Sequence, residues 1–421
     1  MGAPLNPAQP DAQARPGRFL ILILGLLTAL GPLTIDMYLP AFQAIAQSLQ
    51  SPTVLVQQTL SIYFMGMALG QLIYGPLSDR FGRKGPLIIG LALYAVSSLA
   101  CAMAPNIYTL IGFRLFQALG GCAGVVVSRA VTRDYFSPRE MARVMSLLML
   151  VMGLAPVLAP TAGGFLVRYL PLALGWRAVF AVLTLLGLSA MAMVWFSLPE
   201  SLPVAERLQK LEAREIFSSY WHILQDRLFL WPTLAGGLCL GALFTYVSAS
   251  SVVFLEFFKV APFAYSLLFA FNAIGLIGGA QINRFLLKYS SPERVMSRAL
   301  TLSVLFCLIF NVILMIWPAQ LWSTALCLWG VLAALGFVMP NSAAVAMAHL
   351  RGHVGSASAM MGVIQYALGA MCSALVAALL SQYGGQPIVL TAMMFVTLFL
   401  ARLVYRVPTV SAETSAEAAN A

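Results

Sequence analysis

The stretch FLILILGLLTALGPLTIDMYLP, which runs from Phe19 to Pro40, contains a single charged residue, Asp36. A helix needs about 20 mainly apolar residues to cross the hydrocarbon core of a bilayer, so this stretch is long enough for one crossing. An ionised side chain at that depth costs about 3 kcal/mol or several times more. The stretch therefore predicts a membrane span, and its lone carboxylate predicts a functional site.

Apolar runs of this length recur along the whole chain. Of its 421 residues, 61% are hydrophobic and 9% are charged, and the mean hydropathy is +0.89. A soluble domain has about 25% charged residues, and a membrane β-barrel has short alternating segments rather than long unbroken runs. We predict an all-α membrane protein with twelve spans, at 18–42, 54–78, 86–104, 107–130, 141–168, 176–198, 229–256, 262–287, 294–317, 320–349, 355–382 and 387–407.

The first run is interpreted as a retained helix. It is too long for the apolar core of a signal peptide, and no small-residue cleavage site follows it.

Basic residues are distributed unevenly among the loops. Most of the 24 Lys and Arg fall in the two terminal tails and in every second loop, whereas the opposite loops hold only Arg168, Arg177 and Lys259. This asymmetry follows the positive-inside rule and predicts that both termini lie in the cytoplasm. It also accounts for the net charge of +10, so no nucleic-acid partner is expected.

Cysteine and histidine give no sign of a metal site or a cofactor. The six cysteines lie singly in apolar runs, as small packing residues do. His349 and His353 are four residues apart, but Gly352 stands between them and no third ligand is near.

One long polar interruption, from Ser201 to Arg227, divides the spans into six and six. Its mixed charges and helical periodicity predict a cytoplasmic linker with an amphipathic stretch on the membrane surface. The two sets echo each other, because GPLSDRFGRK begins at Gly75 and GAQINRFLLK begins at Gly279. We predict two six-helix bundles around a midplane cavity, with boundaries at 1–17 (a disordered tail), 18–198, 199–228 (the linker), 229–408 and 409–421 (the C-terminal tail).

The loop GPLSDRFGRK resembles the signature of the major facilitator superfamily between helices two and three. Asp79 and Arg83 can form charge-assisted hydrogen bonds, and two glycines would permit a tight turn. In the family, this loop locks the bundles on one side together with an acid at the end of helix four. The resemblance implies a conformational lock made of Gly75, Asp79, Arg80, Gly82, Arg83 and, at the position of that acid, Asp134.

Further stretches narrow the resemblance. RLFQALGG, from Arg114, resembles the family's intramembrane arginine signature, and GLAPVLAPTAGG resembles the helix-five signature of antiporters, with Ala159 where glycine is usual. IDMYLPA, GQLIYGPLSDRFGRK and RDYF together resemble the Bcr/CflA group of drug:proton antiporters. The antiporter signature implies roles for Gly153, Pro156, Pro160, Gly163 and Gly164.

The resemblance implies a transporter and not an enzyme. The expected activity is proton-coupled efflux of drugs or other small amphipathic compounds across the bacterial inner membrane, by a protein that works as a monomer. The alternative is a proton-linked importer or exporter of a metabolite on the same fold.

Asp36 and Arg114 are the expected proton-coupling residues, because a nearby guanidinium favours the ionised form of a carboxylate. Two alternatives remain at this stage. Asp36 could lie at the outer rim, and Arg114 could bond only to backbone carbonyls. Glu256 is a further candidate for coupling, although Lys259 and Pro262 follow it closely and favour a place at the outer rim.

By resemblance to multidrug members, Leu60, Tyr63 and Phe64 of helix two line the substrate cavity. Polar, aromatic and methionine side chains on other spans are further candidates, because such surfaces adapt to varied ligands. Each could instead pack between helices. These candidates are Gln117, Met149, Met152, Tyr246, Asn272, Asn341, Gln365 and Tyr366.

Overall fold

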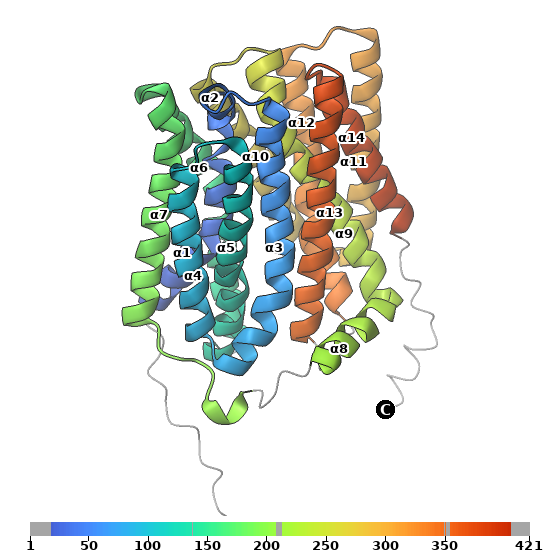
Figure 1. Ribbon diagram of the computed structural model, residues 1–421. Helices are drawn as coiled ribbons and strands as arrows, with labels where there is room; N and C mark the ends of the chain where they lie inside the picture. Colours follow the sequence, from blue (N-terminus) through green and yellow to red (C-terminus); the bar gives the residue numbers. More distant parts are fainter. Residues whose placement is uncertain (1–17, 137, 208–212, 349, 351–353, 406–421) are drawn as a thin grey trace, which may run out of the picture.

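The computed structural model describes residues 18–136, 138–207, 213–348, 350 and 354–405. The described chain is built of helices that run side by side (Figure 1). The elements are α1 (Arg18–Asp36), the 3₁₀ turn η1 (Leu39–Ala41), α2 (Phe42–Ser48), α3 (Thr53–Phe81), α4 (Lys84–Ala102), α5 (Ile107–Tyr135), α6 (Pro138–Tyr169), α7 (Leu172–Ser197), the 3₁₀ turn η2 (Val204–Glu206), α8 (Ala213–Gln225), α9 (Arg227–Ser251), the π-helical segment η3 (Val252–Phe257), α10 (Pro262–Leu286), α11 (Pro292–Ile316), α12 (Leu321–Met347), α13 (Val354–Gln382) and α14 (Pro387–Val404).

The predicted all-α membrane fold is confirmed. Within the described residues, eleven helices are long and apolar enough to cross a membrane, and α6, with 32 residues, occupies the expected fifth span. Each predicted span coincides with one of these helices, and the first span combines α1, η1 and α2. The predicted tails and the pair His349 and His353 lie outside the described residues.

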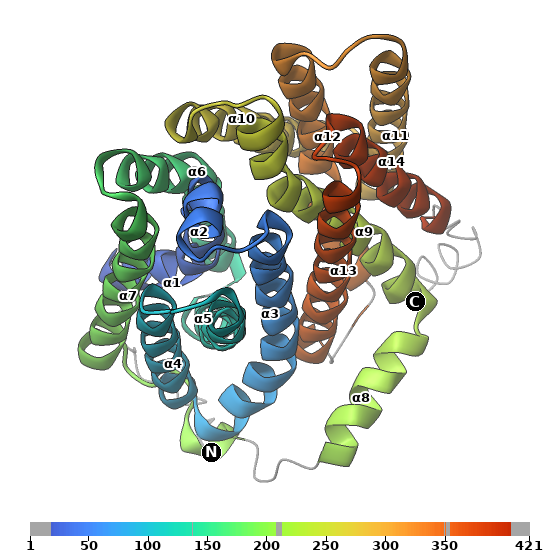
Figure 2. The ribbon, with the colours of Figure 1, turned by 45° about the horizontal axis from the view of Figure 1, so that its top comes forward.

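The spans pack as two six-helix sets. In the first set, α1 and α3 to α7 contact one another, and in the second α9 to α14 do so. The sets meet along α3 with α13 and along α6 with α10 (Figure 2). The short helix α8 packs on α9 and α13 at one end of the bundle, called the linker end below. The opposite end, which carries α2, is called the far end.

Glycines allow the helices to approach closely. A Cβ at Gly120 of α5 would collide with the backbone of α4 at Gly90 and Tyr94. In the second set, a Cβ at Gly279 of α10 would collide with the carbonyl oxygen of Ala333 on α12. Lipid tails are as apolar as the side chains, so helix association in a bilayer depends on this kind of close packing.

The first span is broken directly after Asp36. Pro32 lies within α1, and the chain turns at Met37 and Tyr38 before η1 begins. Gly163 of α6 lies directly against the carbonyl oxygen of Met37. Any larger residue at this position would collide with that oxygen. The break therefore places Asp36 at a helix end inside the bundle.

Replacing Gly120 by Ala should destabilise the first set by about 1–3 kcal/mol, because the added methyl group must displace the α4 backbone. The measurement is the apparent melting temperature of the purified protein in detergent. Gly112→Ala on the same helix is the matched control, since a Cβ there meets nothing within 4 Å. Equal melting temperatures for the two variants would contradict the packing argument.

Candidate functional site

Asp36 lies buried where the two sets of helices meet. The residue is only 5% exposed, so protein covers it almost completely. The following turn, η1, contacts α9 and α10 of the second set. The carboxylate interacts electrostatically with Tyr246 of α9 and Tyr265 of α10. Within the described residues it has no hydrogen bond or ion pair, so an unpaired carboxylate lies at this junction.

The tyrosines that face Asp36 belong to a polar cluster on the second set. The Tyr246 hydroxyl accepts a hydrogen bond of 3.2 Å from Nδ2 of Asn272. The Tyr265 hydroxyl shares one of 2.9 Å with Ser250. All four residues are buried. The cluster offers hydroxyl groups, but no cation, to the carboxylate.

Arg114 occupies a separate, fully buried place in the first set. Its Nη1 donates to Oε1 of Gln117 at 2.8 Å and to the carbonyl oxygen of Thr34 at 3.4 Å. Its Nε and Nη2 find no partner among the described residues. Three aromatic rings lie 4.5 to 5.8 Å from the guanidinium carbon, those of Tyr63, Tyr38 and Phe180. Cation–π attraction therefore stabilises this charge.

The expected approach of Arg114 to Asp36 is not observed, and no carboxylate of the described residues pairs with Arg114. Thr34 and Tyr38, four residues apart, both contact Arg114. Asp36 stands between these two residues in the sequence, but the electrostatic partners that the structure gives it, Tyr246 and Tyr265, belong to the second set.

The predicted lock residues meet at the linker end. Nε of Arg83 donates to Oδ2 of Asp134 at 2.9 Å, and its Nη1 pairs with Asp79 and donates to Ser78 at 3.2 Å. Arg83 itself is buried. The arginine thus joins the ends of α3 and α5, as the charge-assisted bonding of the motif predicts. Arg80 takes no part in these bonds and stacks over Phe81.

Only one of the two motif glycines forms the turn. Gly82 has φ of +88°, a conformation that favours glycine. Gly75 lies inside α3, and a Cβ there would meet nothing within 4 Å, so the expected turn role does not apply to it.

Glu200, which the sequence analysis did not single out, completes the cluster from the start of the linker. Its carboxylate accepts backbone N–H bonds from Arg83 at 2.7 Å, Lys84 at 3.1 Å and Leu202 at 3.1 Å. Arg207 lies 3.8 Å away. Burial acts to raise the pKa of the Glu200 carboxyl, but these hydrogen bonds and Arg207 together hold it below its ordinary value. Glu200 thereby caps α4, whose first N–H groups it accepts.

The helix-five motif contacts both sets. Pro156 and Pro160 lie within α6, and Gly153 faces Ile277 of α10. Gly163 packs on the break after Asp36, and Gly164 packs on Ser266 of α10. Ser266 also donates to the carbonyl oxygen of Pro160 at 2.7 Å. The motif therefore ties the Asp36 segment to the second set.

Aromatic side chains join the sets at the expected cavity. The rings of Phe64 and Phe244 stack at 3.6 Å with an interplanar angle of 6°, across the junction. Tyr366 packs against Phe244 at 5.8 Å. Leu60 and Tyr63 are buried beside Phe64 on α3. The junction between the sets is therefore aromatic near Phe64, in contrast to the polar surroundings of Asp36.

The remaining cavity candidates are dispersed. Gln117 is bonded to Arg114 and Ser98 inside the first set. Asn341 is bonded to Asn283 at 2.8 Å, the position that corresponds to Asp79 in the sequence echo. Gln365 is half-buried on α13. The side chains of Met149 and Met152 lie outside the described residues.

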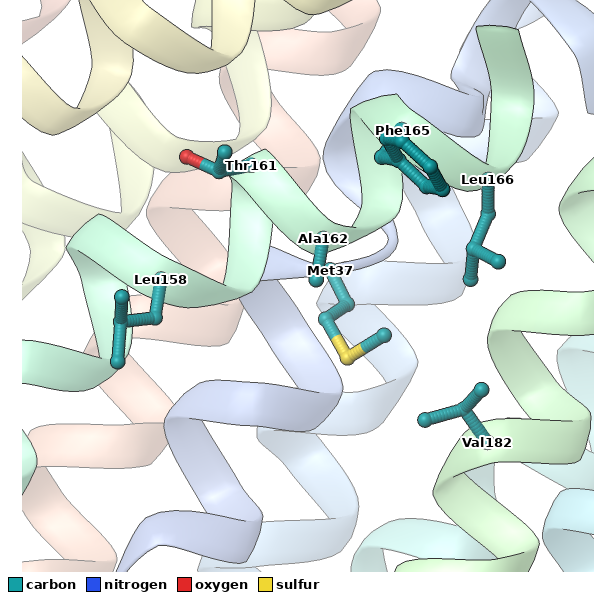
Figure 3. A pocket seen from close by; sticks show the side chains of 7 residues that line it. All are labelled: Met37, Leu158, Thr161, Ala162, Phe165, Leu166 and Val182. Carbon is teal, nitrogen blue, oxygen red and sulfur yellow. The ribbon is translucent and has the colours of Figure 1, made fainter. Parts of the chain in front are cut away.

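A cavity of about 530 Å³ lies on the first set beside the break in α1 (Figure 3). Leu158 and Phe165 on its wall are exposed, so it opens on the surface that faces lipid. Its single polar side chain, Thr161, donates to the carbonyl oxygen of Val157. This apolar cavity has no group to bind a proton, and its lining is Met37, Leu158, Thr161, Ala162, Phe165, Leu166 and Val182.

Several residues of these clusters escaped the sequence analysis. Tyr38 stands two residues after Asp36, and the polar run TYVSASS around Tyr246 is unusual within an apolar span. Both features could have indicated polar groups near Asp36. Phe244 and Tyr265 carry no local signal, because only the tertiary packing brings them to the junction.

Glu200 predicts a specific acid sensitivity. A carboxyl with a lowered folded-state pKa contributes stability that is present above its ordinary value of 4.5 and is lost as pH falls through its folded pKa. We expect the melting temperature of the wild type to fall more steeply than that of Glu200→Gln between pH 7 and about pH 3.5. Glu293→Gln is the control. Parallel curves for wild type and Glu200→Gln would refute this role.

Comparison with known proteins places these clusters in a family. Residues 24–371 match the sequence model of the Major Facilitator Superfamily. The chain is 34% identical to an uncharacterised MFS-type transporter, YdgK, of Bacillus subtilis, over 92% of this chain and 94% of that protein. It is 32% identical to the bicyclomycin resistance protein homolog of Haemophilus influenzae, over 85% and 89%, and 30% identical to the chloramphenicol resistance protein of Pseudomonas aeruginosa, over 76% and 71%. A D-xylose–proton symporter shares the fold, with a TM-score of 0.72 at 13% identity and coverage of 93% and 98%. The chain therefore belongs to the Major Facilitator Superfamily, whose members are transporters and not enzymes.

Proposed function

We propose that the protein exports drugs or other small amphipathic compounds in exchange for protons, by alternating access across the bacterial inner membrane. The names of the bicyclomycin and chloramphenicol resistance relatives support the substrate class. The helix-five motif and its contacts with both sets support antiport rather than symport.

The observation that carries the proposal is the burial of Asp36 between the two sets without a cation. A buried, unpaired carboxylate is stable in its neutral form, because desolvation penalises the charge by several kcal/mol. The packed junction around Asp36 therefore suits the protonated residue. Ionisation of Asp36 would favour a state in which this junction opens to water or accepts a polar substrate.

This preference gives the order of events. Asp36 takes up a proton when the far end is open, and substrate leaves there. The far end then closes over the neutral residue, and the linker end opens. Substrate arriving from the linker end displaces the proton, and the ionised carboxylate destabilises the closed far end. One net charge per cycle would supply about 2.3 kcal/mol per 100 mV, which is roughly a fifty-fold concentration gradient.

The substrate contacts are proposed at the aromatic stack of Phe64 and Phe244 with Tyr366. Phe64 belongs to the first set, whereas Phe244 and Tyr366 belong to the second, so the stack of Phe64 on Phe244 opens when the two sets move apart. A compound with an apolar or aromatic part can replace one ring of the stack. Counterflow of bicyclomycin and chloramphenicol in inverted vesicles under an imposed pH gradient tests export against the alternative of import.

Asp36→Asn should abolish proton-driven efflux, because the amide resembles the protonated carboxyl permanently. The measurement is uphill transport in proteoliposomes as a function of pH, with circular dichroism to establish that the variant folds. Glu256→Gln is the comparison variant and should keep the pH dependence even if its bond to Thr53 changes the transport rate, since Glu256 lies exposed at the far end. Uphill transport by Asp36→Asn, together with its loss in Glu256→Gln, would transfer the coupling role to Glu256.

The proposed orientation places the linker end and both termini in the cytoplasm, following the positive-inside rule. Reporter fusions after Lys84, Arg143, Arg214 and Arg298 should then report cytoplasm. Fusions near Ser51, Pro171 and Gln386 should report the opposite side. A fusion at any of these positions that reports the other side would contradict the proposed orientation of the twelve spans.

A further inference from the structure

One face of α3 carries three polar side chains that all bond to the second set. Thr53, Gln57 and Ser61 are spaced four residues apart, so they lie in one row along the helix. Oγ1 of Thr53 donates to Oε1 of Glu256 at 2.7 Å. Nε2 of Gln57 donates to the carbonyl oxygen of Ser248 at 3.0 Å. These three side chains are called the α3 row.

The third member of the row continues the pattern toward the middle of the bundle. Oγ of Ser61 donates to Oγ of Ser373 on α13 at 3.0 Å. The partners of the row thus come from three elements of the second set, η3, α9 and α13. The row begins at the far end, at the first residue of α3, and approaches the aromatic stack at Phe64. It closes the junction along the outer part of α3.

Gln57, the middle member of the row, is buried, so removal of its hydrogen bond should weaken the contact between the sets. Gln57 is 1% exposed, and a buried polar group that loses its partner destabilises the state in which it is buried. The Ser248 carbonyl that it holds lies between Tyr246 and Ser250 on α9. Tyr246 faces Asp36, and Ser250 bonds to Tyr265, the other tyrosine that faces Asp36. Gln57 therefore holds the α9 segment whose Tyr246 interacts electrostatically with Asp36.

Thr53, the outermost member of the row, bonds to Glu256. This residue lies in the π-helical segment η3, and single turns of π-helix occur frequently at functional sites. Its carboxylate reaches across the junction to Thr53, although the residue is exposed.

We propose that the α3 row is the latch that holds the far end closed, with Gln57 as the positioning residue that keeps the tyrosine-bearing segment of α9 against Asp36. Opening of the far end then requires that these three bonds break together. The inference rests on the proposed alternating access, because the row has a role in transport only if the far end opens.

The test measures the opening directly on purified protein, without substrate or a proton gradient. Spin labels at Gln50 and Gln386, which are exposed on the first and second sets at the far end, report the distance between the sets. We expect Gln57→Leu and Thr53→Val to shift the population from short to long distances, with about a tenfold change in the ratio for Gln57→Leu. Thr53→Ser keeps the donor and should keep the wild-type distribution.

Gln58→Leu is the matched control, because Gln58 is the exposed neighbour on the same helix and points away from the row. Unchanged distances in Gln57→Leu and Thr53→Val, or an equal shift in Gln58→Leu, would overturn the latch. The result is independent of transport, so a protein that opens as expected but moves no drug would contradict the proposed function and leave the latch intact. Thr53 lies at the helix start, so its variants provide the same test if Gln57→Leu fails to fold.

Discussion

The structure depends on the cost of keeping one carboxylate, Asp36, away from water. Its helix ends directly after it, and the turn that follows presses against α9 and α10 of the other set. No cation of the described residues compensates the charge there. A group in such surroundings stays neutral or forces its surroundings to open. Under the proposed function, closure of the far end therefore requires that Asp36 is protonated.

The two ends of the bundle are held together by different kinds of hydrogen bond. The far end is joined by the α3 row and by Ser266 of α10, and the bonds of Gln57, Ser61 and Ser266 are neutral, so they can break and form again at modest cost. The linker end is held by charge-assisted bonds around Arg83, with Glu200 fixing the backbone of the turn. Such bonds are about twice as strong as neutral ones. Within the described residues the bonds of Arg83 stay within the first set and the start of the linker, so this cluster stiffens that set as a unit.

The membrane fold was predictable because its signal is physical and local. Each span needs about 20 mainly apolar residues to cross the bilayer, so each of the twelve apolar runs in the sequence predicts one helical segment of the described structure. The motif residues Asp79, Arg83 and Asp134 lie together as predicted, since opposite charges attract and form ion pairs. Asp36 and Arg114 form no ion pair among the described residues, so their joint role in proton coupling stays a prediction. The sequence could not show which groups surround each of them, because only the packing of the helices decides this. Phe244 and Tyr265 were missed because only packing between the sets makes them part of the site.

The measurement that tests the central claim most directly is proton release by purified protein in weakly buffered solution, when a compound that it transports is added. If Asp36 holds the exchanged proton, the wild type releases about one proton per bound molecule. Asp36→Asn should bind the compound and release none. Equal proton release from the wild type and from Asp36→Asn, at equal binding, would contradict the account.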